Sequence, residues 1–210
     1  MPETFDFVVV GGGSAGAVIA ARLSEDSTCR VALIEAGERP PEVSSMPLAC
    51  AAMQLNPDVD WMYTADPGEK AGLGLKFRRV PVPRGKMLGG SSSINYMMYV
   101  RGHPGDFDSW AEGGATGWSY VDVLPYFRKS EGLGPTGEAV IDAEAHNATG
   151  RLGVSVRSPV LQAASDFVEA AVAAGIPRGD YNGRDRGGPA GTVSLVQSTT
   201  RRGKRSSTYQ

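Results

Sequence analysis

The sequence is poor in cysteine and histidine, with two residues of each among 210. Cys29 and Cys50 are too few for a disulfide framework, and neither they nor His103 and His146 show the spacing of a zinc site. A reducing compartment suits such a chain, because free thiols persist there. The sequence therefore argues against a disulfide-rich secreted protein and gives no support for a metal centre.

Long apolar runs and a strong charge of one sign are also missing. No run approaches the ~20 apolar residues of a membrane span, and residues 1–6 lack the basic segment that opens a signal peptide. The formal net charge is −2, which predicts no electrostatic attraction to nucleic acid or an anionic membrane. We expect a cytoplasmic protein without a membrane span, in which the basic run Arg201–Arg205 forms a solvated turn.

Glycine is abundant, with 28 residues, and its first cluster lies between a strand pattern and a helix pattern. The loop 11–16 follows the apolar run 7–10 and precedes a helical pattern of small residues. Gly11 permits the tight turn, Gly13 lets the backbone approach a pyrophosphate, and Gly16 lets the helix pack closely on the strand. Phosphates then meet free N–H groups at a helix N-terminus.

A second strand pattern, residues 31–34, ends at Glu35, which lies 19 positions after Gly16. A carboxylate there accepts hydrogen bonds from ribose and repels a 2′-phosphate, so NADP is disfavoured while NAD and FAD stay open. A lone glycine motif is also typical of an ordinary turn. The order of strand, loop, helix, strand and acid predicts a Rossmann-like core over residues 5–37.

A second glycine-rich loop, residues 85–95, lies near the middle of the chain. Its Gly-Gly-Ser-Ser-Ser segment supplies unhindered N–H donors and hydroxyls, which suit a pyrophosphate or the polar edge of a flavin. A flexible linker is the alternative, but linkers rarely carry apolar flanks such as Met87, Leu88 and Ile94. Two such loops predict a long ligand that contains a pyrophosphate.

This second loop, continued by Tyr99, Gly102 and Asp108, resembles the first sequence signature of the glucose–methanol–choline (GMC) oxidoreductases. Further similar segments are Glu35-Ala36-Gly37, Asp60-Trp61, Gly117-Trp118-Ser119-Tyr120 and Val123-Leu124-Pro125-Tyr126-Phe127. The resemblance therefore covers nearly the whole chain. GMC proteins are FAD enzymes, so the resemblance favours FAD over NAD.

The resemblance implies an α/β fold with a Rossmann-like FAD-binding domain and the start of a mixed-sheet substrate domain. We expect the FAD-binding domain over residues 1–150, with its second loop at 84–108, and the substrate domain over 151–210. Within the latter, alternating apolar residues predict strands at 152–156 and 193–195. Apolar residues at helical spacing predict a helix from Leu161 to Val172 between them.

Other elements follow from local signals. Ser119 and Asp122 are placed to cap a helix through Phe127, which we expect to be interrupted near Pro125 because proline lacks an N–H group. Residues 46–74 mix glycine and proline with short apolar pieces and predict a loop-rich connection, with a possible short strand at 60–63.

The resemblance also implies the site residues. The expected FAD-binding residues are Gly11, Gly13, Ser14, Ala15, Gly16, Glu35, Ala36, Trp61, Arg84, Gly85, Leu88, Gly89, Gly90, Ser91, Asn95 and Met97. Choline-oxidase-like members attach the flavin through a histidine where this chain has Ile94, so we expect non-covalent FAD. Tyr96 is expected to line the substrate path, as an aromatic does in the aryl-alcohol oxidase branch. A core tyrosine is the alternative, and for Trp61 too a core position is the common role.

The implied activity is oxidation of an alcohol to an aldehyde or ketone, with a proton passing to a base and hydride to flavin N5. Oxygen, a quinone or another carrier would then take the electrons. The shared motifs describe cofactor binding, so a related flavoprotein with other chemistry, such as a photodecarboxylase, stays open, as does a non-catalytic nucleotide-binding module.

No catalytic base is assigned within the chain. The family carries its active-site histidine, with a His or Asn partner, in a C-terminal part, and the sequence reaches Gln210 without a terminal pattern. We therefore expect a C-terminal remainder of the same protein. His103 lies in the turn sequence Arg101-Gly102-His103-Pro104-Gly105 and is expected to be a loop histidine.

Overall fold

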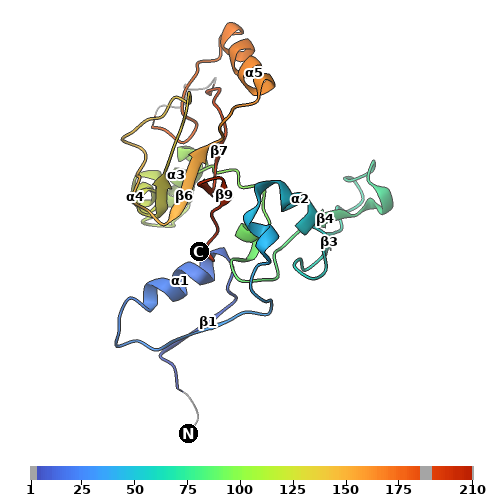
Figure 1. Cartoon of the computed structure of the whole chain (residues 1–210), viewed down its shortest axis with the longest axis vertical. Coiled ribbons are helices and arrows are strands. Elements are labelled where there is room, and N and C mark those ends of the chain that lie inside the picture. Colours follow the sequence, from blue (N-terminus) through green and yellow to red (C-terminus); the bar gives the residue numbers. More distant parts are fainter. Residues whose placement is uncertain (1–3, 185–190, 210) are drawn as a thin grey trace. The chain divides into compact units, whose positions relative to one another are not determined.

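The computed structural model describes residues 4–184 and 191–209 (Figure 1). The chain divides into two compact units, the first of residues 1–97 and 202–210 and the second of residues 98–201. The boundary expected at residue 150 separates a cofactor-binding part from a substrate-binding part. The division into compact units does not show which residues bind the cofactor or the substrate, so the boundary at residue 150 stays a prediction.

The first unit opens with the predicted Rossmann-like core. It consists of β1 (Phe7–Val10), α1 (Ser14–Leu23) and β2 (Val31–Ile34). The β-branched residues of both strands favour extended backbone, and β1 pairs with β2 in parallel, with Phe7 opposite Val31 and Val10 opposite Ile34. The strand, glycine loop, helix and second strand are therefore confirmed.

Short elements make up the rest of the first unit. They are η1 (Glu42–Ser45), η2 (Pro47–Ala49), α2 (Cys50–Met53), β3 (Tyr63–Ala65), η3 (Lys76–Arg78), β4 (Val80–Val82), η4 (Gly90–Ser93) and β9 (Lys204–Arg205). β3 and β4 form an antiparallel pair. The strand expected from Asp60 begins only at Tyr63, because Met62 has a φ of 59°, which extended backbone does not adopt.

A mixed sheet and three helices make up the second unit as far as its residues are described. Its elements are α3 (Pro104–Glu112), α4 (Tyr120–Ser130), β5 (Glu131–Leu133), β6 (Leu152–Val156), α5 (Gln162–Ala173), β7 (Gln197–Ser198) and β8 (Thr200–Arg201). β6 lies between β5, to which it is parallel, and β7, to which it is antiparallel. The strand at 152–156 and the helix α5 are confirmed, as is the mixed character of the sheet.

The predicted cap of α4 is present, but the expected interruption at Pro125 is not. Ser119 and Asp122 form a capping box, and the helix runs through Pro125 to Ser130. The carbonyl that loses its partner at the proline belongs to Val121, which is 75% exposed, so water can satisfy it. Packing of Phe127 against Phe107 holds the helix beyond the proline.

The strand expected at 193–195 was wrong in position. The N–H of Val193 donates to the carbonyl oxygen of Pro177, and Val193 makes an isolated bridge with Arg178. Its backbone is therefore engaged with that segment, and the strand that pairs with β6 is Gln197–Ser198.

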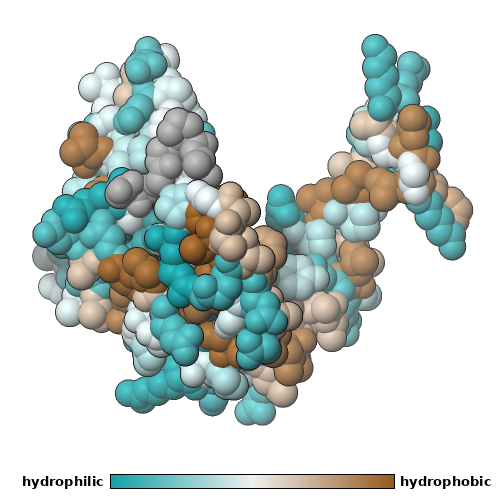
Figure 2. All heavy atoms as spheres, turned by 90° about the horizontal axis from the view of Figure 1, so that it is seen from above, coloured by the Kyte–Doolittle hydropathy of each residue, from teal (hydrophilic) through white to brown (hydrophobic). Residues whose placement is uncertain are grey.

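Apolar side chains are exposed on the Rossmann-like core. Val10 is 82% exposed, and Val8 and Ile34 are each 55% exposed. Figure 2 likewise shows apolar residues, in brown, on the surface that it views. Parallel strands are usually covered on both faces, but within the described residues only α1 packs against this pair. None of the helices in the described part of the chain is both long and apolar enough to cross a membrane.

Candidate cofactor site

The first glycine loop joins β1 to α1 in the geometry that the sequence predicts. Gly11 has a φ of +96°, and a Cβ added to Gly16 would lie 1.9 Å from the carbonyl oxygen of Gly11. Only glycine at both positions permits this turn and the close approach of the helix. The N–H groups of Ser14 and Ala15, in the first turn of α1, have no acceptor within the described residues.

Glu35 places its carboxylate against this loop. One oxygen, Oε2, accepts a 2.6 Å hydrogen bond from the N–H of Gly12, and the other, Oε1, accepts one of 2.9 Å from the N–H of Gly37. The hydrogen bond between Gly12 and Glu35 joins positions 23 residues apart and fixes the end of β2 beside the loop. Ala36, the next residue, is exposed. A ribose contact of this carboxylate remains a prediction.

The second loop is held at its flanks by backbone hydrogen bonds. The N–H of Lys86 donates to the carbonyl of Val59, and that of Leu88 donates to the carbonyl of Glu38. Met87 between them is 1% exposed and packs with Met53 and Ile94 in the core of the first unit. The apolar flanks thus anchor the loop, so it is no flexible linker.

The two glycine loops lie against each other. The N–H of Gly89 donates to the carbonyl of Gly12 at 2.7 Å, and a Cβ added to Gly90 would lie 2.7 Å from Cα of Gly13. A Cβ on Gly12 would meet the side chain of Leu88 at 2.8 Å. Positions more than seventy residues apart therefore lie in direct contact, and glycine at each position leaves room for the close approach of the two loops.

Asp60 is a buried residue of this site whose role the sequence did not reveal. It is 1% exposed and accepts hydrogen bonds from the backbone N–H groups of Leu55, Met62 and Arg84. Burial acts to raise the pKa of Asp60, but these three donors lower it on balance. The carboxylate therefore fixes the start of the second loop at Arg84. The Asp-Trp pair was the only signal for it in the sequence.

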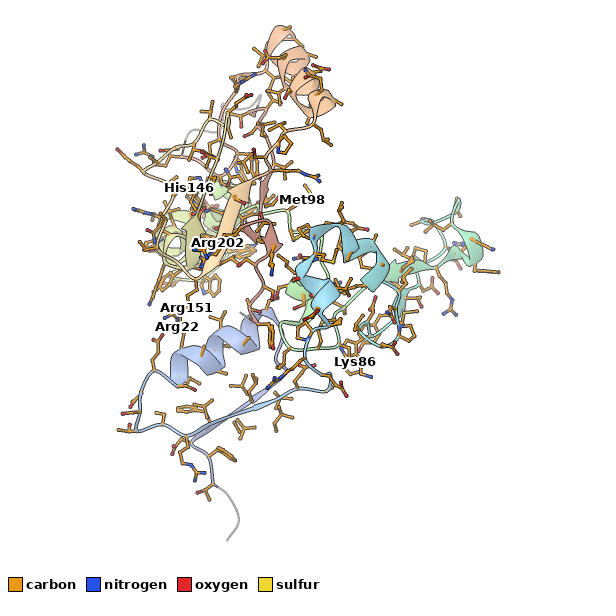
Figure 3. The ribbon with its side chains drawn as sticks, in the orientation of Figure 1. Arg22, Lys86, Met98, His146, Arg151 and Arg202 are labelled. Carbon is orange, nitrogen blue, oxygen red and sulfur yellow. The ribbon has the colours of Figure 1, made fainter. Side chains whose placement is uncertain are left out.

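Trp61 is 42% exposed and so is no core residue of the first unit. Its ring stacks on Tyr63 at a centroid distance of 6.0 Å, and the ammonium of Lys86 lies 5.2 Å from the ring centroid (Lys86 is labelled in Figure 3). The backbone N–H of Trp61 donates to the carbonyl of Arg84. The backbone of Trp61 thus meets the second loop, while its ring is engaged elsewhere.

The exit of the second loop carries the remaining expected residues. The Oγ of Ser91 accepts from the N–H of Gly85 at 3.2 Å, and Oδ1 of Asn95 accepts from the N–H of Met97 at 3.0 Å. Met97 is buried, whereas Tyr96 is 58% exposed. The exposure of Tyr96 leaves its ring accessible in this unit, and the substrate contact and its alternative, a packing role, both stay predictions.

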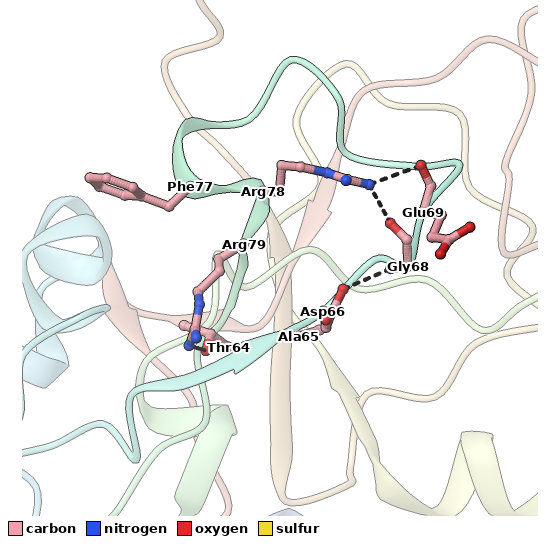
Figure 4. Close-up of a pocket in the computed structure, with 8 residues that line it drawn as sticks. All are labelled: Thr64, Ala65, Asp66, Gly68, Glu69, Phe77, Arg78 and Arg79. Carbon is pink, nitrogen blue, oxygen red and sulfur yellow. Dashed lines mark hydrogen bonds between the residues drawn. The ribbon is translucent and has the colours of Figure 1, made fainter.

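Two hollows in the first unit involve none of the expected cofactor residues. One, of about 440 Å³, lies in the β3–β4 segment, where the guanidinium of Arg78 donates to the carbonyls of Gly68 and Glu69 (Figure 4). The other, of about 910 Å³, lies between residues 40–46 and residues 204–209. Neither is needed to explain the glycine loops.

A buried charged network in the second unit was also missed at the level of sequence. His146, labelled in Figure 3, bonds through Nδ1 to Glu131 at 2.6 Å and through Nε2 to Asp180 at 2.8 Å. Arg101 forms an ion pair with the other oxygen of Glu131. These four side chains are almost fully buried and come from positions 15 to 79 residues apart, so no local pattern reveals them.

This network decides the protonation of His146. Burial favours the neutral ring, but hydrogen bonds and charge from Asp180 and Glu131 prevail and raise its pKa to about 9. Burial likewise acts to raise the pKa of Asp180, which His146 and two backbone donors lower on balance. His146 is thus a charged structural residue at neutral pH. His103, as expected, lies outside a helix, where its Nδ1 accepts from Gly105 and caps α3.

Residues 5–210 match the sequence profile of the GMC oxidoreductases. The chain belongs to the GMC oxidoreductase family. The oxygen-dependent choline dehydrogenase of Sinorhizobium medicae is 42% identical over 205 residues, which are 95% of this chain and 34% of that protein. The glucose dehydrogenase [FAD, quinone] of Drosophila melanogaster is 40% identical over 204 residues, which are 96% of this chain and 31% of that protein.

Solved structures of GMC-like oxidases share this fold. The pyridoxine 4-oxidase of Mesorbium loti has a TM-score of 0.82 and 34% identity, covering 98% of this chain and 38% of that one. A formate oxidase has a TM-score of 0.76 and 30% identity, and the match covers 98% of this chain and 36% of that one. The predicted α/β fold is therefore confirmed, and the chain spans about a third of the length of the relatives that it matches.

Proposed function

We propose that this GMC chain is the FAD-binding part of a flavoenzyme that oxidises an alcohol to an aldehyde or ketone. The observation that carries the proposal is the contact between the two glycine loops, because it seats the second loop against the turn whose Ser14 and Ala15 N–H groups can bind a phosphate. The glucose dehydrogenase relative is named for FAD, which supports the same cofactor here.

The residues present fit the diphosphate of FAD. A phosphate at the N-terminus of α1 would meet the unpaired N–H groups of Ser14 and Ala15, with no side chain at Gly11 or Gly13 to exclude it. Glu35 would bind the ribose next to it. The expected set of sixteen cofactor residues, from Gly11 to Met97, stays our proposal, with Trp61 supported least because its ring is engaged with Tyr63 and Lys86.

When bound, FAD would supply the hydride acceptor, and the chain's own residues would bind and orient it. The base that takes the alcohol proton is not assigned to either histidine. Both ring nitrogens of His146 are bonded to carboxylates and the ring is already protonated at neutral pH, so it cannot accept a proton there. We place the base in a C-terminal part of the same protein, which the greater length of the relatives supports.

We also propose that residues 151–210 begin the substrate domain and that the protein is cytoplasmic. The electron acceptor is either oxygen or a quinone or other carrier, because relatives named for oxygen and for quinone both occur. Cell fractionation tests the location, and turnover with oxygen or a soluble quinone as the sole acceptor identifies the electron acceptor.

Purified full-length protein tests the cofactor. It should be yellow, and denaturation should release FAD. A nicotinamide nucleotide without flavin absorption would refute the proposal. Acid precipitation separates the modes of attachment: because Ile94 offers no nucleophile, the flavin should remain in the supernatant, and flavin in the pellet would show a covalent link.

A further inference from the structure

Arg205 is a buried cation that fastens three segments of the first unit. It is 1% exposed, although it belongs to the basic run for which a solvated turn was expected. Its Nε donates to the carbonyl of Ser44, and its Nη1 donates to the carbonyls of Ser92 and Asn95 at 3.2 and 2.8 Å. It therefore holds the exit of the second glycine loop against residues far away in sequence.

The acceptors of Arg205 are neutral, and no carboxylate pairs with it among the described residues. Its Nη2 is buried and has no hydrogen-bond partner there. Burial lowers its pKa from the ordinary value, yet a guanidinium stays charged at physiological pH. The loop exit therefore has a permanent positive charge behind it.

Arg205 also decides how the amide of Asn95 is turned. Nη1 donates to Oδ1 of Asn95 at 2.8 Å, and the N–H of Met97 donates to the same oxygen. Because a guanidinium has donors and no acceptor, only the oxygen of the amide can face it. Nδ2 of Asn95 then points away from both donors, on an exposed residue, and has no acceptor within the described part of the chain.

We propose that Arg205 is a positioning residue, which locks the exit of the second glycine loop and turns the Nδ2 donor of Asn95 toward the bound cofactor. The inference rests on the proposed function, because it requires FAD at these loops. Arg205 does not itself reach the cofactor in this proposal, and its effect on FAD passes through the side-chain amide of Asn95. We therefore expect variants of Arg205 and variants of Asn95 to weaken FAD binding in the same way.

The test uses full-length protein freed of flavin and titrated with FAD. Arg205→Lys keeps the charge but loses the planar fork, so it should raise the dissociation constant of FAD about tenfold, the equivalent of one good hydrogen bond. Asn95→Ala should do the same. The matched control Lys204→Gln changes the exposed neighbour on the same strand and should bind FAD like the wild type.

The double variant decides whether the two residues act together. If Arg205 acts through Asn95, combining the changes should weaken FAD binding no more than the stronger single change. Losses that multiply would overturn the inference, as would an Arg205→Lys protein with the affinity and flavin absorption spectrum of the wild type. Wild-type protein that bound no FAD would instead refute the proposed function itself.

Asn95→Asp provides a measurement that does not depend on the folding of Arg205 variants. Aspartate keeps the oxygen that faces Arg205 and adds a charge partner for it, but has no Nδ2 donor. The variant should unfold at the wild-type temperature or above and still bind FAD more weakly. Unchanged FAD affinity together with a lower unfolding temperature would mean that Asn95 only packs the loop.

Discussion

At the scale of single residues, Glu35 makes two bonds to backbone N–H groups and is expected to hold ribose as well. Glu35→Ala should weaken FAD binding, because hydrogen bonds to a charged group are worth about 1.5–3 kcal/mol. FAD retained after gel filtration measures this. Glu38→Ala is the matched control, since its exposed side chain leaves the backbone bonds unchanged. Equal retention in both variants would make Glu35 a merely structural acid.

Tyr96 is predicted to contact the substrate, and its exposed ring is free to do so. Tyr96→Ala should reduce kcat/KM for aromatic alcohols more than for aliphatic ones, because ring stacking contributes about 0.5–1.5 kcal/mol beyond burial. Tyr96→Phe keeps the ring and should preserve the preference. Equal losses on both classes of alcohol, with a lower unfolding temperature, would show packing instead of contact.

At the scale of elements, the contact between the glycine loops has no room for a side chain. Gly90→Ala places a methyl 2.7 Å from Cα of Gly13 and should force the loops apart, which abolishes tight FAD binding. Its φ of +51° adds a backbone cost of roughly 1–2 kcal/mol. Gly68→Ala is the control. Gly68 also has a positive φ, of +74°, but a Cβ added there meets no atom within 4 Å beyond its chain neighbours, so the variant should lose stability and keep FAD. Tight FAD binding by Gly90→Ala would contradict the site.

At the scale of the whole molecule, the network around His146 predicts a pH dependence of stability. The pKa of His146 is raised from about 6.5 in the unfolded chain to about 9 in the fold. Its contribution, on the order of 3 kcal/mol, is therefore complete below about pH 6.5 and is lost as the pH rises to about 9. Urea unfolding across this range measures it. The charged groups that face His146 are Arg101, Glu131 and Asp180, and Tyr99 contacts Arg101 in turn.

His146→Gln should remove most of that slope, and it should also reduce the stability that Asp180 loses in acid, because His146 is the main group that lowers the pKa of Asp180 against its burial. The control His103→Gln removes an exposed cap of α3 and should lower stability by up to about 1–2 kcal/mol without changing the slope between pH 6.5 and 9. A wild-type protein with constant stability over that range would contradict the assigned charge of His146.

The sequence by itself determined the features that depend on neighbours along the chain. The apolar runs 7–10 and 31–34, the glycine turn between them and the capping box of Ser119 and Asp122 are all present. Each depends on φ preferences, strand propensity or a hydrogen bond within a few residues. Where this logic failed, at Pro125 and at Val193, contacts with distant segments prevailed over the local preference.

Only the tertiary structure decided which of those features meet. Gly89 bonds to Gly12, Arg205 is buried against Ser44 and Asn95, and Arg101 pairs with Glu131, and each of these pairs is separated by 30 to 161 positions. No periodicity specifies such partners, because a side chain or loop takes whatever complementary group the folded backbone brings to it. Burial then enforces the choice, since a polar group removed from water must be paired or it destabilises the fold.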